Sequence, residues 1–238
     1  MSFRPSIKLT LVLLALAVVF FRLGLWQWDR KAEKVLLFES FENAPVMTMA
    51  QALSGTEPFV RVEAEGRYDP VRHTLLDNRI FKGRAGVHVL TPFTLPDGSA
   101  ILVNRGWLPL AADRRSLPEF NTNPAEQRIS GILTRPVIGG PRVGGADELR
   151  TDHWPQLMTY LDLDSISAAT GQSLEPWILL LGADDPDGFE DRQWQAAVME
   201  PKVHGAYALQ WFSLAAAAMV IWVVLGVRRA RQSNGTKI

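Results

Sequence analysis

The chain has 238 residues, 47% of them hydrophobic, and no net formal charge, but its charges are segregated. Residues 29–203 hold 18 Lys and Arg against 25 Asp and Glu, a net charge of −7, whereas the two ends carry seven basic residues and no acidic ones. Nucleic acid is not an expected partner, because its binding needs a basic face. Basic ends instead favour contact with anionic membrane lipid.

The first predicted element is an apolar helix over residues 9–28, "LTLVLLALAVVFFRLGLWQW". Its 20 residues, at about 1.5 Å each, are enough to cross the hydrocarbon core of a bilayer. Arg22 lies near one end, where its side chain can reach the headgroups, and Trp26 and Trp28 are typical of an interfacial aromatic belt. A cleaved signal peptide is the alternative, but the long apolar run without a small-x-small cleavage site favours a retained helix.

Residues 29–43 contain neither Gly nor Pro, so they are expected to continue this helix into the aqueous phase until Pro45 stops it. A short helix is expected in "MTMAQAL". Alternation of apolar and charged residues then predicts strands. They are expected in "FVRVEAEGRYD", "HTLLDNRIF", "GVHVLTPFTL", "AILVNRGWLPL", "QRISGILTR", "TYLDLD" and "EPWILLLGA".

Three of the segments that connect these strands have sequence patterns that predict their structure. Asp97-Gly98 predicts a hairpin, "DSISAATG" predicts a short helix that ends at Gly171, and "VIGGPRVGGADE" predicts a loop. Six or seven strands at short spacing indicate one antiparallel barrel or sandwich.

The second apolar span carries no charged residue from Ala206 to Val227 and is predicted as a transmembrane helix over residues 204–227. Basic residues precede the first span and follow the second, which predicts that both termini are cytoplasmic. The expected organisation is a cytoplasmic N-terminus (1–8), a first transmembrane helix (9–28), a periplasmic β-rich domain (29–203), a second transmembrane helix (204–227) and a cytoplasmic basic tail (228–238).

The expected fold class is therefore a membrane protein in which two transmembrane α-helices flank one extracytoplasmic domain. That domain is expected to be mostly antiparallel β, barrel- or sandwich-like, with a few short helices. The chain has no cysteine, so no disulfide supports it. Nothing resembles an organellar transit peptide, which favours a bacterial inner membrane as the location.

A histidine stands at the entrance of the second span. His204, Tyr207 and Trp211 fall at i, i+3 and i+7, so they share a helix face. A neutral imidazole commonly binds metals and haem iron, and flat aromatic neighbours suit a porphyrin plane. The residues alone favour the alternative, an interfacial histidine that is hydrogen-bonded to water or headgroups.

Trp26 and Arg30 are four residues apart on the first helix and also share a face. A cation beside an indole at the membrane surface can hold an acidic group such as a haem propionate. The alternative is an aromatic belt with a snorkelling arginine that contacts lipid phosphate. In "LVNRGWLP", Trp107 is expected in the core, and Arg105 is expected to pair with an acid such as Asp77.

No enzyme signature is found. His73, His88 and His153 are far apart and show no HxxxH or HxH spacing, so a zinc site is not predicted. Neither G-x-S-x-G nor G-x-x-x-x-G-K-[ST] occurs, so a hydrolase or a phosphate-binding loop is unsupported.

The chain resembles the Surfeit locus protein 1 family, the assembly factors of haem–copper cytochrome c oxidase, over nearly its whole length. Four motifs in the family's order carry the resemblance: "GLWQWDRKAEK" after the first span, "GVHVLTPF" and "VNRGWLP" in the middle, and "HGAYALQWF" at the second span. The chain departs from the family at Lys202 and Val203, where one or two Asn usually precede the histidine.

The resemblance implies a non-enzymatic membrane factor that binds haem a at the membrane surface and assists its insertion into the largest oxidase subunit. It implies His204 as the axial ligand of the haem iron. Tyr207, Trp211 and Trp26 are expected to flank the macrocycle, and Arg30 to meet a propionate.

The expected partners are cytochrome c oxidase subunit 1, its assembly intermediates and membrane lipid, with haem a synthase as a further candidate. The alternative function is a structural adaptor that stabilises oxidase assembly intermediates without binding haem.

Overall fold

A computed structural model describes residues 3, 5–111, 113, 116–136, 149–197 and 199–235. The chain forms two compact units, residues 1–39 with 196–238, and residues 40–195. The helices are α1 (Ile7–Glu42), α2 (Met49–Ser54), α3 (Leu163–Thr170) and α4 (Pro201–Gly235). The strands are β1 (Phe59–Tyr68), β2 (Thr74–Phe81), β3 (Arg84–Thr94), β4 (Ala100–Pro109), β5 (Gln127–Thr134), β6 (Gln156–Met158) and β7 (Leu174–Leu181).

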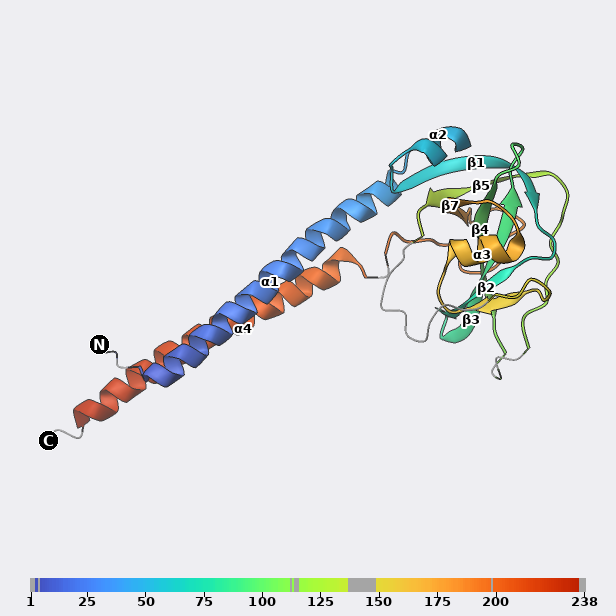
Figure 1. Cartoon of the computed structure of the whole chain (residues 1–238). Coiled ribbons are helices and arrows are strands. Elements are labelled where there is room, and N and C mark those ends of the chain that lie inside the picture. Colours follow the sequence, from blue (N-terminus) through green and yellow to red (C-terminus); the bar gives the residue numbers. More distant parts are fainter. Residues whose placement is uncertain are drawn as a thin grey trace. The chain divides into compact units, whose positions relative to one another are not determined.

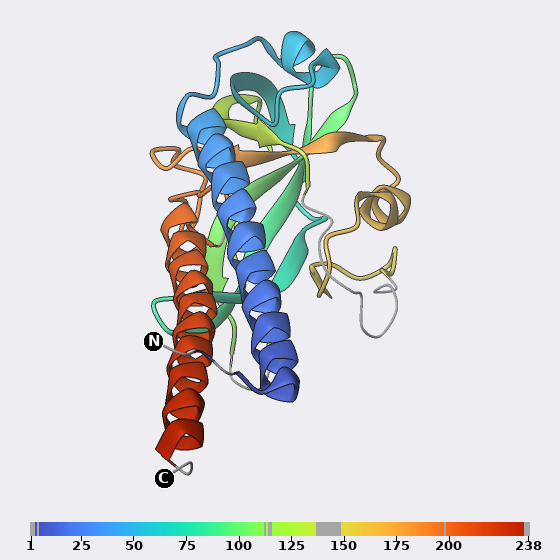
Figure 2. The ribbon, with the colours of Figure 1, turned by 90° about the vertical axis from the view of Figure 1, so that its left-hand side faces the viewer.

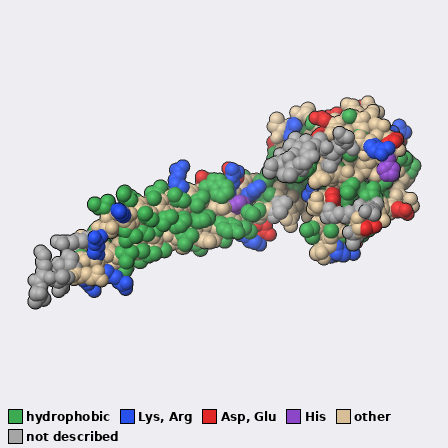
Figure 3. All heavy atoms as spheres, turned by 60° about the horizontal axis from the view of Figure 1, so that its bottom comes forward, with side chains coloured by type: hydrophobic (Ala, Val, Ile, Leu, Met, Phe, Trp, Pro, Cys, Tyr) green, Lys and Arg blue, Asp and Glu red, His purple; other side chains and the backbone are tan. Residues whose placement is uncertain are grey.

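The first unit contains α4 and most of α1, which run side by side in opposite directions (Figures 1 and 2). Each of these helices is long and apolar enough to cross a membrane. Hydrophobic side chains cover the visible face of the pair, and basic side chains gather toward its ends (Figure 3). The predicted continuation of the first helix is confirmed, since α1 ends at Glu42, three residues before Pro45.

The second unit is built on a sheet with the strand order β1-β5-β7-β4-β3-β2-β6. An additional pairing of β1 with β3 joins Arg67 to Thr94 and Tyr68 to Phe93, and it closes five of the strands into a ring. The backbones meet so closely there that a Cβ atom on Gly66 would overlap the carbonyl oxygen of Thr94. A glycine is therefore required where the ring closes.

The alternation predicted for the first strand is confirmed. Val60, Val62 and Ala64 are buried, while the charged residues between them are exposed. These apolar side chains belong to a cluster that receives residues from every strand of the ring, and α2 packs against it. Because burying apolar surface contributes about 25 cal/mol per Å² removed from water, this cluster stabilises the unit.

A second cluster lies under α3 and β6. Ile166 of α3 and Met158 of β6 pack against Leu90 and Leu102. Asp162 caps α3 through its side chain, which accepts from the amides of Asp164 and Ser165.

The predicted short helices are confirmed. The end of α3 at Gly171 is in the left-handed conformation with φ 67°. At the start of α2, Thr48 and Gln51 form a reciprocal capping box.

The fold-class prediction is confirmed in part: two apolar helices near the termini flank a sheet with few helices. The sheet, however, is mixed, because β2 pairs with β6 and β4 with β7 in parallel. Local patterns predict hairpins between sequence neighbours, as at Asp97-Gly98 between β3 and β4. They carry no signal for strands that meet after a long connection.

The strand predicted for "TYLDLD" is wrong. Its first residues form no strand, and the strand β6 ends before them at Met158. The apparent alternation arises because Leu161 packs against the cluster under α3 while Asp162 is the helix cap. The loop predicted for "VIGGPRVGGADE" lies outside the described residues.

Candidate functional site

The candidate site is built on the interface between α1 and α4. Leu13, Ala17 and Ala218 are buried together, and Leu9 and Trp222 pack against them. The indole Nε1 of Trp222 donates to Oγ1 of Thr10 at 3.0 Å, which satisfies a polar group within an apolar interface. Small residues and this interhelical hydrogen bond therefore help to hold the two helices in a defined register.

Close approach of the helices depends on Gly24. A Cβ atom at this position would lie 2.5 Å from a ring carbon of Phe212, well inside normal contact distance. The Phe212 ring also packs against Phe21 at a centroid distance of 5.6 Å. The absence of a side chain at Gly24 thus makes room for an aromatic ring from the other helix.

His204 lies one helical turn into α4 and is partly buried. Its Nδ1 is hydrogen-bonded to Oε1 of Gln27 on α1, at 2.8 Å. In the described part of the chain, Nε2 of the same ring has no hydrogen-bond partner. One nitrogen of the imidazole is therefore hydrogen-bonded to the opposite helix, and the other is available to bind a further group.

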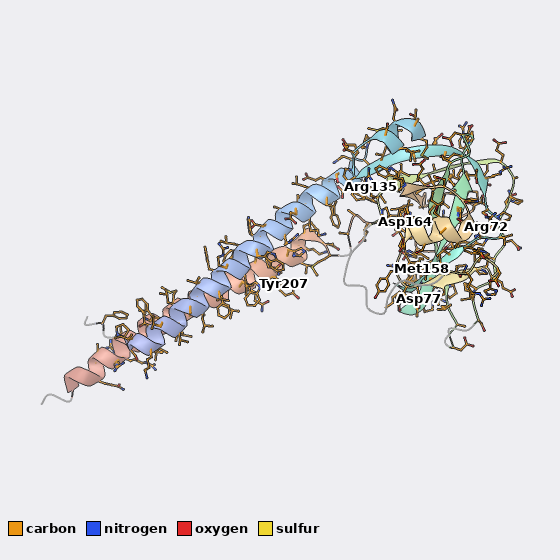
Figure 4. The ribbon with its side chains drawn as sticks, in the orientation of Figure 1. Arg72, Asp77, Arg135, Met158, Asp164 and Tyr207 are labelled. Atoms are coloured by element: carbon orange, nitrogen blue, oxygen red, sulfur yellow. The ribbon has the colours of Figure 1, made fainter. Side chains whose placement is uncertain are left out.

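The other predicted site residues on α4 take different positions. Trp211 is partly buried and stacks on Phe20 of α1, with ring centroids 5.7 Å apart and planes inclined by 26°. Tyr207 projects from the side of α4 (Figure 4) and is 46% exposed. Ala208, between them, is the residue of this turn that is buried against α1. Trp211 thus contributes to the interface, while Tyr207 is accessible.

Trp26 and Arg30 form a second pair on α1. The guanidinium carbon of Arg30 lies 6.0 Å from the centroid of the Trp26 ring, at the outer limit of a cation–π contact. Arg30 also forms an ion pair with Glu33 at 2.7 Å, in which both side chains are about half exposed. Such an exposed pair contributes little stability, so Arg30 can exchange Glu33 for another anion at low cost.

Gln27 is the residue that sequence reasoning did not assign to the site. It belongs to the motif "GLWQWDRKAEK", but its partner His204 lies 177 residues away. Its position directly after Trp26 and three residues before Arg30, both predicted site residues, is the sequence signal that could have placed it at the site. Only the register between α1 and α4 shows that its amide reaches the imidazole.

The "VNRGWLP" motif lies on β4 in the second unit. Arg105 is buried at 2% exposure, between the rings of Tyr68 and Phe189 at 4.7 and 4.9 Å. Its Nε donates to the main-chain oxygen of Asp187 at 2.8 Å, and its Nη1 donates to Oγ1 of Thr122 at 2.6 Å. Arg105 therefore joins β4 to the segment after β7, which is a structural role.

The expected pairing of Arg105 with Asp77 is wrong. Asp77 instead interacts electrostatically with Arg79. Burial lowers the pKa of Arg79, and the negative charge of Asp77 opposes this shift only in part. Trp107 is fully buried, as predicted, and its Nε1 donates to the main-chain oxygen of Arg79 at 3.0 Å.

The remaining histidines lie in the second unit and apart from one another. His73 contacts Oγ1 of Thr91 at 3.1 Å, and His88 contacts the amide nitrogen of Asn104 at 3.2 Å. Burial lowers the pKa of both rings, in His88 to about 4, with Arg79 as a second cause there. Among the described residues, no group of three His, Cys, Asp or Glu side chains is arranged to hold a metal ion.

Comparison with known proteins gives a consistent result. A protein from Rickettsia felis named SURF1-like protein is 26% identical over 227 residues, which cover 91% of this chain and 96% of the relative. A SURF1-like protein from Monosiga brevicollis is 30% identical, with 93% of this chain and 89% of the relative covered. Surfeit locus protein 1 from Mus musculus is 27% identical, with 91% and 75% covered.

The family comparison spans the whole sheet and reaches into both long helices. A model of the SURF1 family matches residues 14–216. This range runs from within α1, through the whole sheet, to Ala216 of α4, and it includes Gln27 and His204. The chain therefore belongs to the SURF1 family.

Proposed function

We propose that this protein is anchored in a bacterial inner membrane by α1 and α4. The proposed spans are residues 9–28 and 204–227, with residues 1–8 and 228–238 in the cytoplasm and residues 29–203 in the periplasm. The length and hydropathy of both helices support this. The basic residues that precede the first span and follow the second support the orientation.

The proposed function is assembly of haem–copper cytochrome c oxidase: the protein binds haem a at the membrane surface and assists its insertion into subunit 1. It does this as a binding protein rather than as an enzyme. Its partners are subunit 1 and its assembly intermediates, with haem a synthase as a further candidate. The observation that carries the proposal is His204, a partly buried imidazole with a free nitrogen at the end of an apolar helix pair.

The residues of the site fit a haem as cargo. Nε2 of His204 can bind iron, since a neutral imidazole is a common haem ligand. The exposed rings of Tyr207 and Trp26 offer apolar surface for the macrocycle, as does the uncovered part of the Trp211 ring, which is stacked on Phe20. Arg30, whose ion pair with Glu33 is exposed, can meet a propionate. An apolar, prenylated haem is poorly soluble in water, so a site at the edge of the bilayer suits it.

The test is an optical one. The protein is expressed in a host that makes haem a, purified in mild detergent and reduced, and its spectrum is compared with those of His204→Ala and His153→Ala. His153 is an exposed residue of the second unit and serves as the matched control. A haem a band is expected in the wild type and in His153→Ala, and it should be lost in His204→Ala.

Two results would count against this proposal. A haem a band of full strength in His204→Ala would remove His204 from the site. No band in any folded variant, with haem a present in the host membranes, would exclude haem binding. The alternative would then lead, in which the protein is an adaptor that stabilises oxidase assembly intermediates without a cofactor.

A further inference from the structure

We propose that Gln27 is a positioning residue that fixes the tautomer of His204 and so makes Nε2 the ligand nitrogen. This inference rests on the proposed function for its purpose, but the state of the imidazole can be measured without any haem. It follows from one hydrogen bond between two helices, from the packing on both sides of that bond, and from the chemistry of a neutral imidazole.

The hydrogen bond joins Nδ1 of His204 to Oε1 of Gln27 at 2.8 Å. In this orientation of the Gln27 amide its oxygen faces Nδ1, and an amide oxygen only accepts hydrogen bonds, so the bond places the proton on Nδ1. A neutral imidazole has one N–H group, and Nε2 therefore keeps its lone pair. If the Gln27 amide were reversed, its NH₂ group would donate to Nδ1, and the proton on Nε2 would block iron binding. The orientation of this one amide thus decides whether the histidine can be a ligand.

Packing holds the two side chains at this distance. On one side, Gly24 lies one helical turn from Gln27 and admits the ring of Phe212. On the other side, the aliphatic stem of Lys31 approaches Gly205, next to His204, where a Cβ atom would lie 3.4 Å from the Lys31 Cδ. α1 and α4 therefore approach each other closely before the hydrogen bond and are in ordinary packing range after it, and this packing restricts the separation of the helices there.

The choice of glutamine also has a chemical consequence. Groups that accept from the non-ligating nitrogen of a histidine orient the ring and raise its basicity as a ligand. A carboxylate raises the basicity more than a neutral amide does, because a charge-assisted hydrogen bond is stronger. Gln27 therefore orients His204 while leaving it a moderate ligand, which suits a cargo that must be released. Gln27→Glu should bind haem more tightly and lower its reduction potential.

The tautomer is measured by solid-state ¹⁵N NMR of the haem-free protein, labelled at histidine and reconstituted in lipid at about pH 8, where histidine is ordinarily neutral. His204→Ala identifies the signals of His204 among the four histidines. The wild type and Gln27→Glu should show a protonated Nδ1 and a bare Nε2. Gln27→Leu should show both tautomers, and Gln210→Leu, an exposed glutamine on α4, should match the wild type.

A protonated Nε2 on His204 in the wild type would overturn the inference directly. An unchanged His204 spectrum in Gln27→Leu would overturn it as well. If the expected tautomers are found, the same variants are titrated with haem b in mild detergent. Gln27→Leu should then bind about 10- to 100-fold more weakly than the wild type, and equal affinities would contradict a positioning role.

The two proposals fail in different ways. Expected tautomers together with no haem a band in the purified wild type would leave the Gln27–His204 assignment intact and reject the proposed function. A His204-dependent haem a band together with the wrong tautomer would support the function and reject the role of Gln27.

Discussion

His88 should make the stability of the sheet unit depend on pH. Its Nδ1 accepts from the amide of Asn104 at 3.2 Å, and the Oδ1 of Asn104 accepts from the main-chain amide of Gly106 at 3.1 Å, which orients the Asn104 side chain. Protonation of His88 would put two donors against each other. Burial and the nearby Arg79 lower the pKa of His88 to about 4.

The sign of the effect follows from this lowered pKa. An unfolded histidine titrates near 6.5, so between about pH 6.5 and pH 4 the unfolded chain binds a proton that the folded chain does not. The free energy of unfolding is therefore highest above about pH 7 and decreases as the pH falls. A gap of roughly 2.5 pKa units corresponds to about 3 kcal/mol in full, of which about 2 kcal/mol should be lost by about pH 5.

The assay is urea unfolding of the full chain in detergent, followed by tryptophan fluorescence at about pH 7.5 and pH 5. His88→Asn places an amide oxygen near the position of Nδ1 and removes the titrating group. This variant should lose about 2 kcal/mol less than the wild type between the two pH values. His73, whose pKa is also lowered by burial, contributes equally to both proteins. His153→Asn, at an exposed site, controls for the loss of one histidine. Equal losses in the wild type and His88→Asn would refute the reasoning.

Two further predictions concern the helices. Gly24→Ala should reduce the stability of the helix pair by about 1–3 kcal/mol, because the new Cβ overlaps the Phe212 ring. The stability of the pair is measured as the mole fraction of SDS at which it unfolds. Adding Phe212→Ala to Gly24→Ala should offset part of the lost stability. If the effects of the two substitutions are simply additive, a direct contact is contradicted. Asp162→Ala should lower the stability of the sheet unit by about 1 kcal/mol, since the cap of α3 is lost, and Asp162→Asn should retain most of it. A urea midpoint equally reduced in both variants would show that capping is not the cause.

Local sequence patterns predicted most of the secondary structure. The alternation around Val60 and Val62 predicted β1 because the side-chain period of a strand is two and one face meets a core. Pro45 and Gly171 predicted helix ends because each residue restricts or permits a specific backbone conformation. In "TYLDLD" the same reasoning was wrong. Asp162 is the N-cap of α3 and Leu161 packs against the cluster under α3, so an apolar residue beside a polar one gives the alternation of a strand without forming one.

Pairings between distant segments could not be predicted in this way. The parallel contact of β4 with β7 depends on how the chain returns after α3, and no local pattern encodes that path. The hydrogen bond between Gln27 and His204 likewise joins residues that are far apart in the sequence, so no local pattern predicts it. The apolar pattern indicated that each helix is long enough for a membrane, but the rotation of one helix against the other is set by contacts such as Gly24 with Phe212.

The helix-pair site and the folded core of the sheet rest on different side chains. The interface between α1 and α4 contains a small cluster around Leu13, Ala17 and Ala218. The ring of strands is filled by its own cluster, to which Trp177 contributes at 1% exposure. A change at His204 or Gln27 should therefore leave the urea unfolding of the sheet unit unchanged, so a lost haem signal in these variants would report on the site itself rather than on a misfolded protein.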